Sequence, residues 1–141
     1  YILTDMDEPQ AVLLGTGSEV EIALRAQAAL AADGIRTRVV SMPCTSVFDR
    51  QSEAYQELVL PLNLPTVAVE AAHPDFWRKY VGRTGVVVGI ATFGESAPAS
   101  VLYEHFGITA ARLVDAARTL VHRAAHRREQ PLPAHIVPSS N

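Results

Sequence analysis

The sequence predicts an α/β protein, a three-layer α/β/α sandwich whose mostly parallel sheet has about five strands, one of them an antiparallel edge strand. Three observations predict this class. Short, continuously apolar runs recur along the 141 residues, and such runs form strands that are covered on both faces. Segments with helical spacing separate the runs, as in sheets built from parallel strands. The right-handed crossover rule then favours a Rossmann-like arrangement.

The first half of the chain provides three of these strands and one helix. Residues 1–4 read as a strand, and because only a short turn follows, it should pair antiparallel at or near an edge. The run AVLLG (11–15) is a buried strand, and residues 35–43 form another that stops at Pro43. Between them, residues 19–33 follow a helical period that Asp33 and Gly34 end. The stripe predicted to be buried in this helix is Val20, Ala23, Leu24, Ala28 and Ala31.

The second half continues the alternation. The runs TVAVEAA (66–72) and GVVVGIA (85–91) are the remaining strands. The segments with helical spacing are 51–60, 75–81, 98–106 and 109–126. Thr109 is the predicted N-cap of the last helix, whose inward residues are predicted to be Ala110, Leu113, Val114, Ala117 and Val121. We predict one domain over 1–126 and a disordered tail over 127–141, which holds three prolines.

Composition and charge argue against several classes of partner. The net charge is −3, and the 5 basic residues after position 110 complement a helix C-terminus. No aromatic residues interleave with them, as nucleic-acid stacking would favour. No apolar run approaches the roughly 18 residues that a membrane span needs. We therefore expect no nucleic acid and no membrane, and the single Cys44 and lack of a signal segment suggest a cytoplasmic protein.

The glycine-rich turn GTGS raises the question of a phosphate site. A dinucleotide site would need a third glycine where Val20 stands and an acidic residue where Ser41 stands. Ser18 and Glu21 instead match the S-x-x-E capping box, and the Glu19 carboxylate repels phosphate. We predict that the turn starts a helix. The less favoured alternative is a small-anion site formed by Gly15, Thr16, Gly17 and Ser18.

Polar residues follow the strand that ends near position 70. Glu70 and His73 could act as an acid–base pair, but a metal site would need a third well-spaced ligand besides Asp75, so we predict no metal. The aromatic residues Phe76 and Trp77 are interpreted as anchors of a short helix, either on the core or on a partner.

The stretch ATFGESAPAS follows the last apolar strand. It lacks a nucleophile elbow because Pro98 stands where the second glycine would be needed. Phe93, Glu95 and Ser96 are therefore predicted to contact a neighbouring domain or subunit. Cys44 is expected to be a small buried residue, although a thiolate near a helix start is the alternative. We predict no catalytic and no cofactor-binding residue in this chain.

Four stretches together resemble the C-terminal domain of transketolase, of the thiamine diphosphate-dependent family. They are LLGTGSEVEIAL, RVVSMPCTSVFDRQ, VAVEAAHPDFWRKYVG and ATFGESAPASVLYEHFG, in the family's order between residues 1 and 121. The resemblance implies the C-terminal structural and dimerisation domain of a transferase. That enzyme moves a two-carbon ketol unit between sugar phosphates in the pentose phosphate pathway. It also implies thiamine diphosphate and a divalent metal, Mg or Ca, bound by other domains, because this chain has no Gly-Asp-Gly.

The resemblance leaves three hypotheses open. In the first, the chain is part of a longer transketolase and is inactive alone; its partners are the remaining domains and the second subunit of a homodimer. In the second, it is the subunit of a split transketolase. In the third, it is a free-standing module that binds a small anion or a nucleotide. The chain departs from the common family pattern at Ala72, where glycine is usual, and at Cys44, where serine is frequent.

Overall fold

The computed structural model describes residues 1–70, 74–89 and 99–130, with the backbone alone for 74, 99–106 and 108. Its single sheet has five strands in the order β1-β3-β2-β4-β5. The strands are β1 (Ile2–Asp5), β2 (Ala11–Gly15), β3 (Thr37–Ser41), β4 (Thr66–Glu70) and β5 (Val86–Gly89). Edge strand β1 runs antiparallel to β3, and the other three pairings are parallel. The predicted α/β class and the antiparallel edge strand are confirmed.

The strand register divides the interior into two cores. On the central strand β2, Leu13 lies between Val39 of β3 and Val67 of β4. Because side chains alternate along a strand, these three residues point to one face of the sheet. The neighbouring Val12 and Leu14 point to the other. All five residues are fully buried, as expected for a sheet with helices on both faces.

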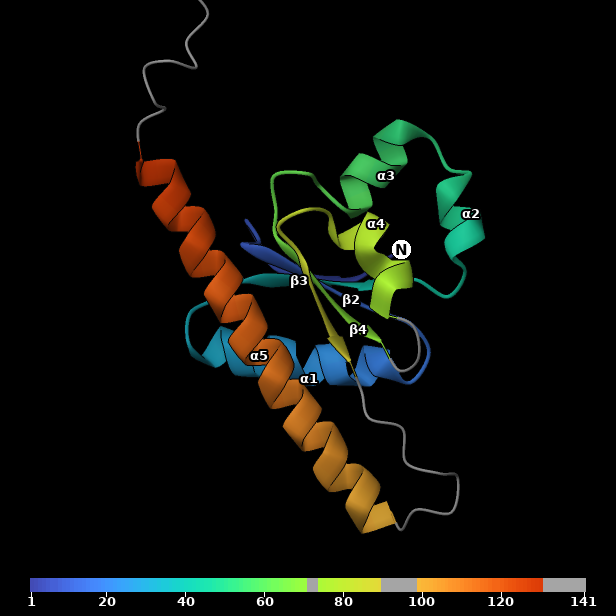
Figure 1. Ribbon diagram of the computed structural model, residues 1–141, viewed down its shortest axis with the longest axis vertical. Coiled ribbons are helices and arrows are strands. Elements are labelled where there is room, and N and C mark those ends of the chain that lie inside the picture. The colour runs from blue at the N-terminus through green and yellow to red at the C-terminus, as the bar shows by residue number, and fades with distance from the viewer. Residues whose placement is uncertain (71–73, 90–98, 131–141) are drawn as a thin grey trace, which may run out of the picture.

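Helices α1 (Glu19–Ala32) and α5 (Ala99–Glu129) cover the first face. The second face carries α2 (Thr45–Asp49), α3 (Glu53–Val59), the 3-10 turn η1 (Pro74–Trp77) and α4 (Arg78–Val81). Figure 1 shows the two helical layers on either side of the strands. The three-layer sandwich is therefore confirmed.

Helix α1 is rotated relative to the prediction. Its buried residues are Ile22, Ala23, Ala26 and Leu30. Of the predicted stripe, Ala23 is buried and Leu24 packs against the first core. Ala28 and Ala31 are exposed, so the prediction is wrong for these two residues. Burial free energy grows with apolar area, so the large side chains of Ile22 and Leu30 set the rotation. The alanines, which made the predicted stripe look apolar, contribute little.

Helix α5 is continuous where the sequence predicts two helices. It runs from Ala99 to Glu129 through Gly107, and Thr109 lies inside it rather than at its N-cap. A glycine inside a helix costs only about 1 kcal/mol relative to alanine, so Gly107 need not end the first segment. The inward residues after position 110 were predicted correctly, and Leu120 joins them. The helix extends beyond the predicted domain end at 126; the tail stays a prediction because 131–141 lie outside the described residues.

Arg38 ties the edge strand to the helical layer. Its side chain, 11% exposed, forms two hydrogen bonds to the Asp5 carboxylate at 3.1 and 3.0 Å. Nη1 also donates to the Leu58 carbonyl at 2.6 Å, at the end of α3. A fork of this kind fixes the orientation of both partners. Through Arg38, β3 therefore holds both β1 and α3 in place.

Candidate functional site

The carboxyl ends of the parallel strands form one edge of the sheet, where open α/β sheets bind ligands. Strand β2 ends there at Gly15, β3 at Ser41 and β4 at Glu70. The glycine turn begins at this edge, and its first carbonyl, Gly15 O, accepts a hydrogen bond of 2.9 Å from the amide of Met42. The predicted small-anion site thus lies where the topology would put a ligand.

The turn is compact and uses its own amides. A Cβ on Gly15 would lie 3.2 Å from the backbone of Glu19, and Gly17 has a φ of +57°. The amide of Glu19 donates to Thr16 O at 3.1 Å, and that of Val20 donates to Gly17 O at 3.3 Å. Two amides that open α1 are therefore already paired inside the protein.

The predicted capping box is wrong. Ser18 has φ −66° and ψ −21°, which are helical values, and its side chain makes no capping hydrogen bond. A capping serine needs an extended backbone to turn its hydroxyl back toward the helix. The carboxylate of Glu21 pairs instead with Arg25, at 3.4 Å.

The charge around the turn is unfavourable to phosphate. The Glu19 Oε2 atom lies 3.6 Å from where a Cβ on Gly17 would stand, and Glu21 adds a second carboxylate to the first turn of α1. These groups complement the positive end of the helix and compete with an anion for it. The turn therefore does not fit the diphosphate of thiamine diphosphate, and small-anion binding at Gly15–Ser18 stays a prediction.

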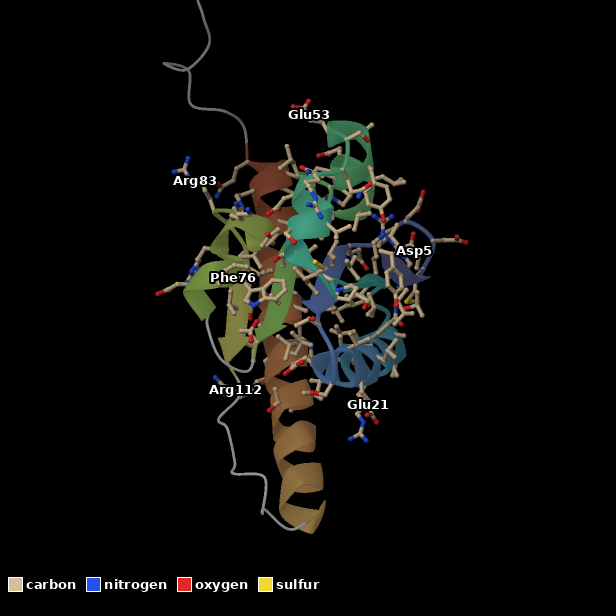
Figure 2. All side chains as sticks on the ribbon, turned by 90° about the vertical axis from the view of Figure 1, so that its right-hand side faces the viewer. Asp5, Glu21, Glu53, Phe76, Arg83 and Arg112 are labelled. Atoms are coloured by element: carbon tan, nitrogen blue, oxygen red, sulfur yellow. The ribbon has the colours of Figure 1, made fainter. Side chains whose placement is uncertain are left out.

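Phe76 and Trp77 are adjacent in sequence but differ in environment. Trp77 is 3% exposed and belongs to the second core, whereas Phe76 is 54% exposed. Their rings meet nearly edge to face, with centroids 5.8 Å apart. Figure 2 shows Phe76 on the side of the molecule that carries η1 and α4. Of the predicted contact residues, Trp77 is thus an internal anchor and Phe76 is available at the surface.

Several sequence candidates fall outside the described residues. They are His73, Phe93, Glu95 and Ser96. Of the nearby acidic residues, Glu70 is partly buried at the end of β4, and Asp75 is exposed in η1. Across the described part of the chain, no three His, Cys, Asp or Glu side chains gather as a metal site would require.

A charged network between α2 and α4 was missed at the level of sequence. Asp49 accepts hydrogen bonds from Lys79 Nζ at 2.8 Å and from the Tyr80 hydroxyl at 3.0 and 3.1 Å. The hydrogen bond from Lys79 lowers the pKa of Asp49, and the same bond raises the pKa of Lys79. Burial, followed by the hydrogen bond to Asp49, raises the pKa of Tyr80. The only sequence signal was the motif FDRQ, whose aspartate is Asp49.

Cys44 is exposed, so its expected burial is wrong. It precedes α2 in an extended conformation with a φ of −145°, which leaves its side chain outside the core. Its Sγ lies 3.2 Å from Ser46 Oγ. This hydrogen bond, with that to the backbone of Val47, lowers the pKa of the thiol.

No helix in the described ranges is long and apolar enough to cross a bilayer.

A family profile described as "Transketolase-like TK C-terminal domain" matches residues 1–109. The chain belongs to the transketolase C-terminal domain family. The resemblance read from the four sequence stretches is therefore confirmed.

Whole transketolases contain regions similar to this domain. The chromosomal transketolase of Cupriavidus necator is 55% identical over 124 residues, which are 88% of this chain and 18% of that protein. Transketolase 1 of Escherichia coli K12 is 50% identical over 123 residues, 86% of this chain and 18% of that protein. Thus the transketolase C-terminal domain described here spans less than one fifth of the length of these relatives.

Solved transketolase structures contain the same fold. The transketolase of Leishmania mexicana superposes with a TM-score of 0.74 and 44% identity, covering 87% of this chain and 18% of that one. A Pichia stipitis transketolase in complex with sedoheptulose 7-phosphate gives a TM-score of 0.76 and 32% identity, covering 89% of this chain and 18% of that one. The mostly parallel sheet with one antiparallel strand is therefore that of a transketolase C-terminal domain.

Proposed function

We propose that this chain is the C-terminal structural and dimerisation domain of a transketolase. The observation that carries the proposal is the 55% identity with a transketolase over 124 residues. The parent enzyme would transfer a two-carbon ketol unit between sugar phosphates in the pentose phosphate pathway, in the cytoplasm. Its other domains would bind thiamine diphosphate and the divalent metal, Mg or Ca, because the glycine turn of this domain does not fit a diphosphate.

The residues of this domain would contribute stability and contacts between domains. Asp49 is held by Lys79 and Tyr80, and Glu21 pairs with Arg25. These charged groups support the fold, and we assign no catalytic role to them. Phe76, with Phe93, Glu95 and Ser96, is proposed to contact the remaining domains or the second subunit.

The length of the native polypeptide is the test of this proposal. Mass spectrometry of peptides from the source cell, with an antibody against this domain, would reveal the parent chain. We expect a band several times larger than 15.2 kDa, with upstream peptides that contain Gly-Asp-Gly. A native chain of 15.2 kDa would contradict the proposal. Co-purification of a cofactor-binding chain would then indicate a split transketolase.

A further inference from the structure

A cavity of about 740 Å³ opens between α2, α3 and α4. Its aromatic lining is Phe48 and Tyr80, whose ring centroids are 6.1 Å apart. Leu60 and Leu62 add aliphatic surface, and Leu62 is 93% exposed. The predicted anion turn and Phe76 do not line this cavity.

The charged lining of the cavity is negative. Three carboxylates line it, those of Asp49, Glu53 and Glu57, together with one ammonium group, that of Lys79. Lys79 is already paired with Asp49 at 2.8 Å. Glu57 accepts a hydrogen bond from the amide of Leu62 at 3.2 Å. Across the described residues, neither Glu53 nor Glu57 forms a salt bridge, so two formal negative charges stay unneutralised.

Lys79 illustrates the chemistry that this lining supports. Its ammonium nitrogen lies 5.1 Å from the centroid of the Tyr80 ring while it donates to the Asp49 carboxylate. An ammonium group held between a carboxylate and an aromatic face gains both an ionic and a cation–π contact. Glu53 and Glu57 are one helical turn apart on α3 and offer a second cation two carboxylates. Figure 2 shows the Glu53 side chain at the outer end of α3.

We propose that this cavity binds an organic cation with an apolar chain. Its ammonium or guanidinium group would meet Glu53 and Glu57, and its carbon chain would lie mainly against Leu60 and Leu62. Phe48 and Tyr80 are each only 8% exposed and would add a small aromatic area at the base. The negative lining disfavours sugar phosphates, and an aromatic and aliphatic wall does not suit a bare metal ion. The proposal therefore concerns a ligand other than the sugar phosphates of ketol transfer.

Calorimetric titration of the full chain with spermidine at low ionic strength tests the proposal. We expect saturable binding at one site. The double variant E53Q/E57Q should weaken it at least tenfold, because each carboxylate near a cation contributes about fivefold in water. Glutamine at 57 retains the oxygen that accepts the Leu62 amide. Lys79→Met should tighten spermidine binding several-fold, because the Asp49 carboxylate then has no lysine partner and can pair with the ligand. A misfolded variant would lose affinity, so a gain in affinity cannot come from misfolding.

A matched control removes the same charge elsewhere. Asp7 and Glu8 are both exposed in the turn before β2, and neither lines the cavity, so D7N/E8Q should bind spermidine within twofold of the native chain. Absence of saturable binding at millimolar spermidine would overturn the proposal. So would an equal loss in D7N/E8Q and E53Q/E57Q, since that would indicate a general charge effect.

A free polyamine and a basic side chain of a neighbouring protein both carry a cationic group on an apolar chain. Cadaverine and a blocked diarginine peptide carry equal charge, so their affinities separate the two sources. Binding of the peptide that is tighter by tenfold or more would identify a protein segment as the natural occupant. Tighter binding of cadaverine would identify a free polyamine as the natural occupant. Either result supports the site if E53Q/E57Q weakens it, and insensitivity of both ligands to E53Q/E57Q would overturn it.

Discussion

At the scale of single residues, the closest backbone approach is at Gly85, before β5. A Cβ there would lie 2.2 Å from Val81 O and 2.6 Å from Thr66 O, both backbone atoms. We expect Gly85→Ala to lower the free energy of unfolding by about 3 kcal/mol, because the loop and β4 must move apart. Urea denaturation measures the loss. Gly89→Ala is the control, since a Cβ there meets nothing within 4 Å. If both variants lose the same free energy of unfolding, the close backbone contacts at Gly85 are not the cause.

Asp49 gives the domain a specific pH dependence. The hydrogen bond from Lys79 lowers the folded pKa of this carboxyl. Its stabilisation is therefore fully present above the ordinary aspartate pKa and is lost as the pH falls through the lowered value. We expect Asp49→Asn to lower the urea midpoint of unfolding at about pH 7. Between about pH 7 and about pH 3, the midpoint of this variant should fall less than that of the native protein.

The matched control for this titration is Asp7→Asn, since Asp7 is exposed and forms no salt bridge within the described ranges. Its midpoint should follow that of the native chain at both pH values. The same acid-dependent drop in Asp49→Asn and the native protein would show that the Lys79 pair adds no pH-dependent stability.

At the scale of elements, Gly107 tests whether α5 is one helix. The helix is continuous from Ala99 to Glu129, and a Cβ on Gly107 meets nothing within 4 Å. Alanine should therefore raise the free energy of unfolding by about 0.5–1 kcal/mol, because it reduces the entropy that the chain loses in the helix. Thermal and urea denaturation followed by circular dichroism measure the change. A destabilised Gly107→Ala protein would instead indicate that glycine ends the first of two helices, as its sequence pattern predicts.

The sequence predicted the elements whose residues carry their own signal. Four apolar runs marked the parallel strands, and the short turn after residue 4 marked the antiparallel edge strand. Helix rotation and continuity were harder, because alanines in α1 resemble a buried stripe and Gly107 resembles a helix end. The hydrogen bond from Tyr80 to Asp49 could not be predicted, since it joins residues 31 positions apart. Such contacts depend on how α2 and α4 pack on the sheet.

At the scale of the whole molecule, exposed apolar side chains are unevenly distributed. Across the described side chains, large exposed hydrophobic residues occur at the N-terminal residue, on β1 and along the segment from α2 to η1, and none occurs on α1 or α5. They are Tyr1, Leu3, Val47, Leu58, Leu62 and Phe76. Large exposed hydrophobic residues that gather on one side of a domain mark a contact with another protein. The proposed contacts with the rest of a transketolase are therefore expected on the β1 and α2–η1 side.

Phe76 is the residue of this surface whose truncation should weaken the dimer while changing the free energy of unfolding little. Its ring is 54% exposed and rests on Trp77 and Tyr80, with centroids 5.8 and 6.1 Å away. In the full-length parent enzyme, Phe76→Ala should weaken the dimer at least tenfold, since aromatic anchors dominate interfaces. The free energy of unfolding should fall by only about 1 kcal/mol, because half of the ring is already in water. Analytical ultracentrifugation measures the dimer constant. Thr119→Ala, at an exposed position of α5 and outside this surface, is the control that should leave dimerisation within twofold. An unchanged dimer constant in Phe76→Ala would exclude this face of η1 from the subunit contact.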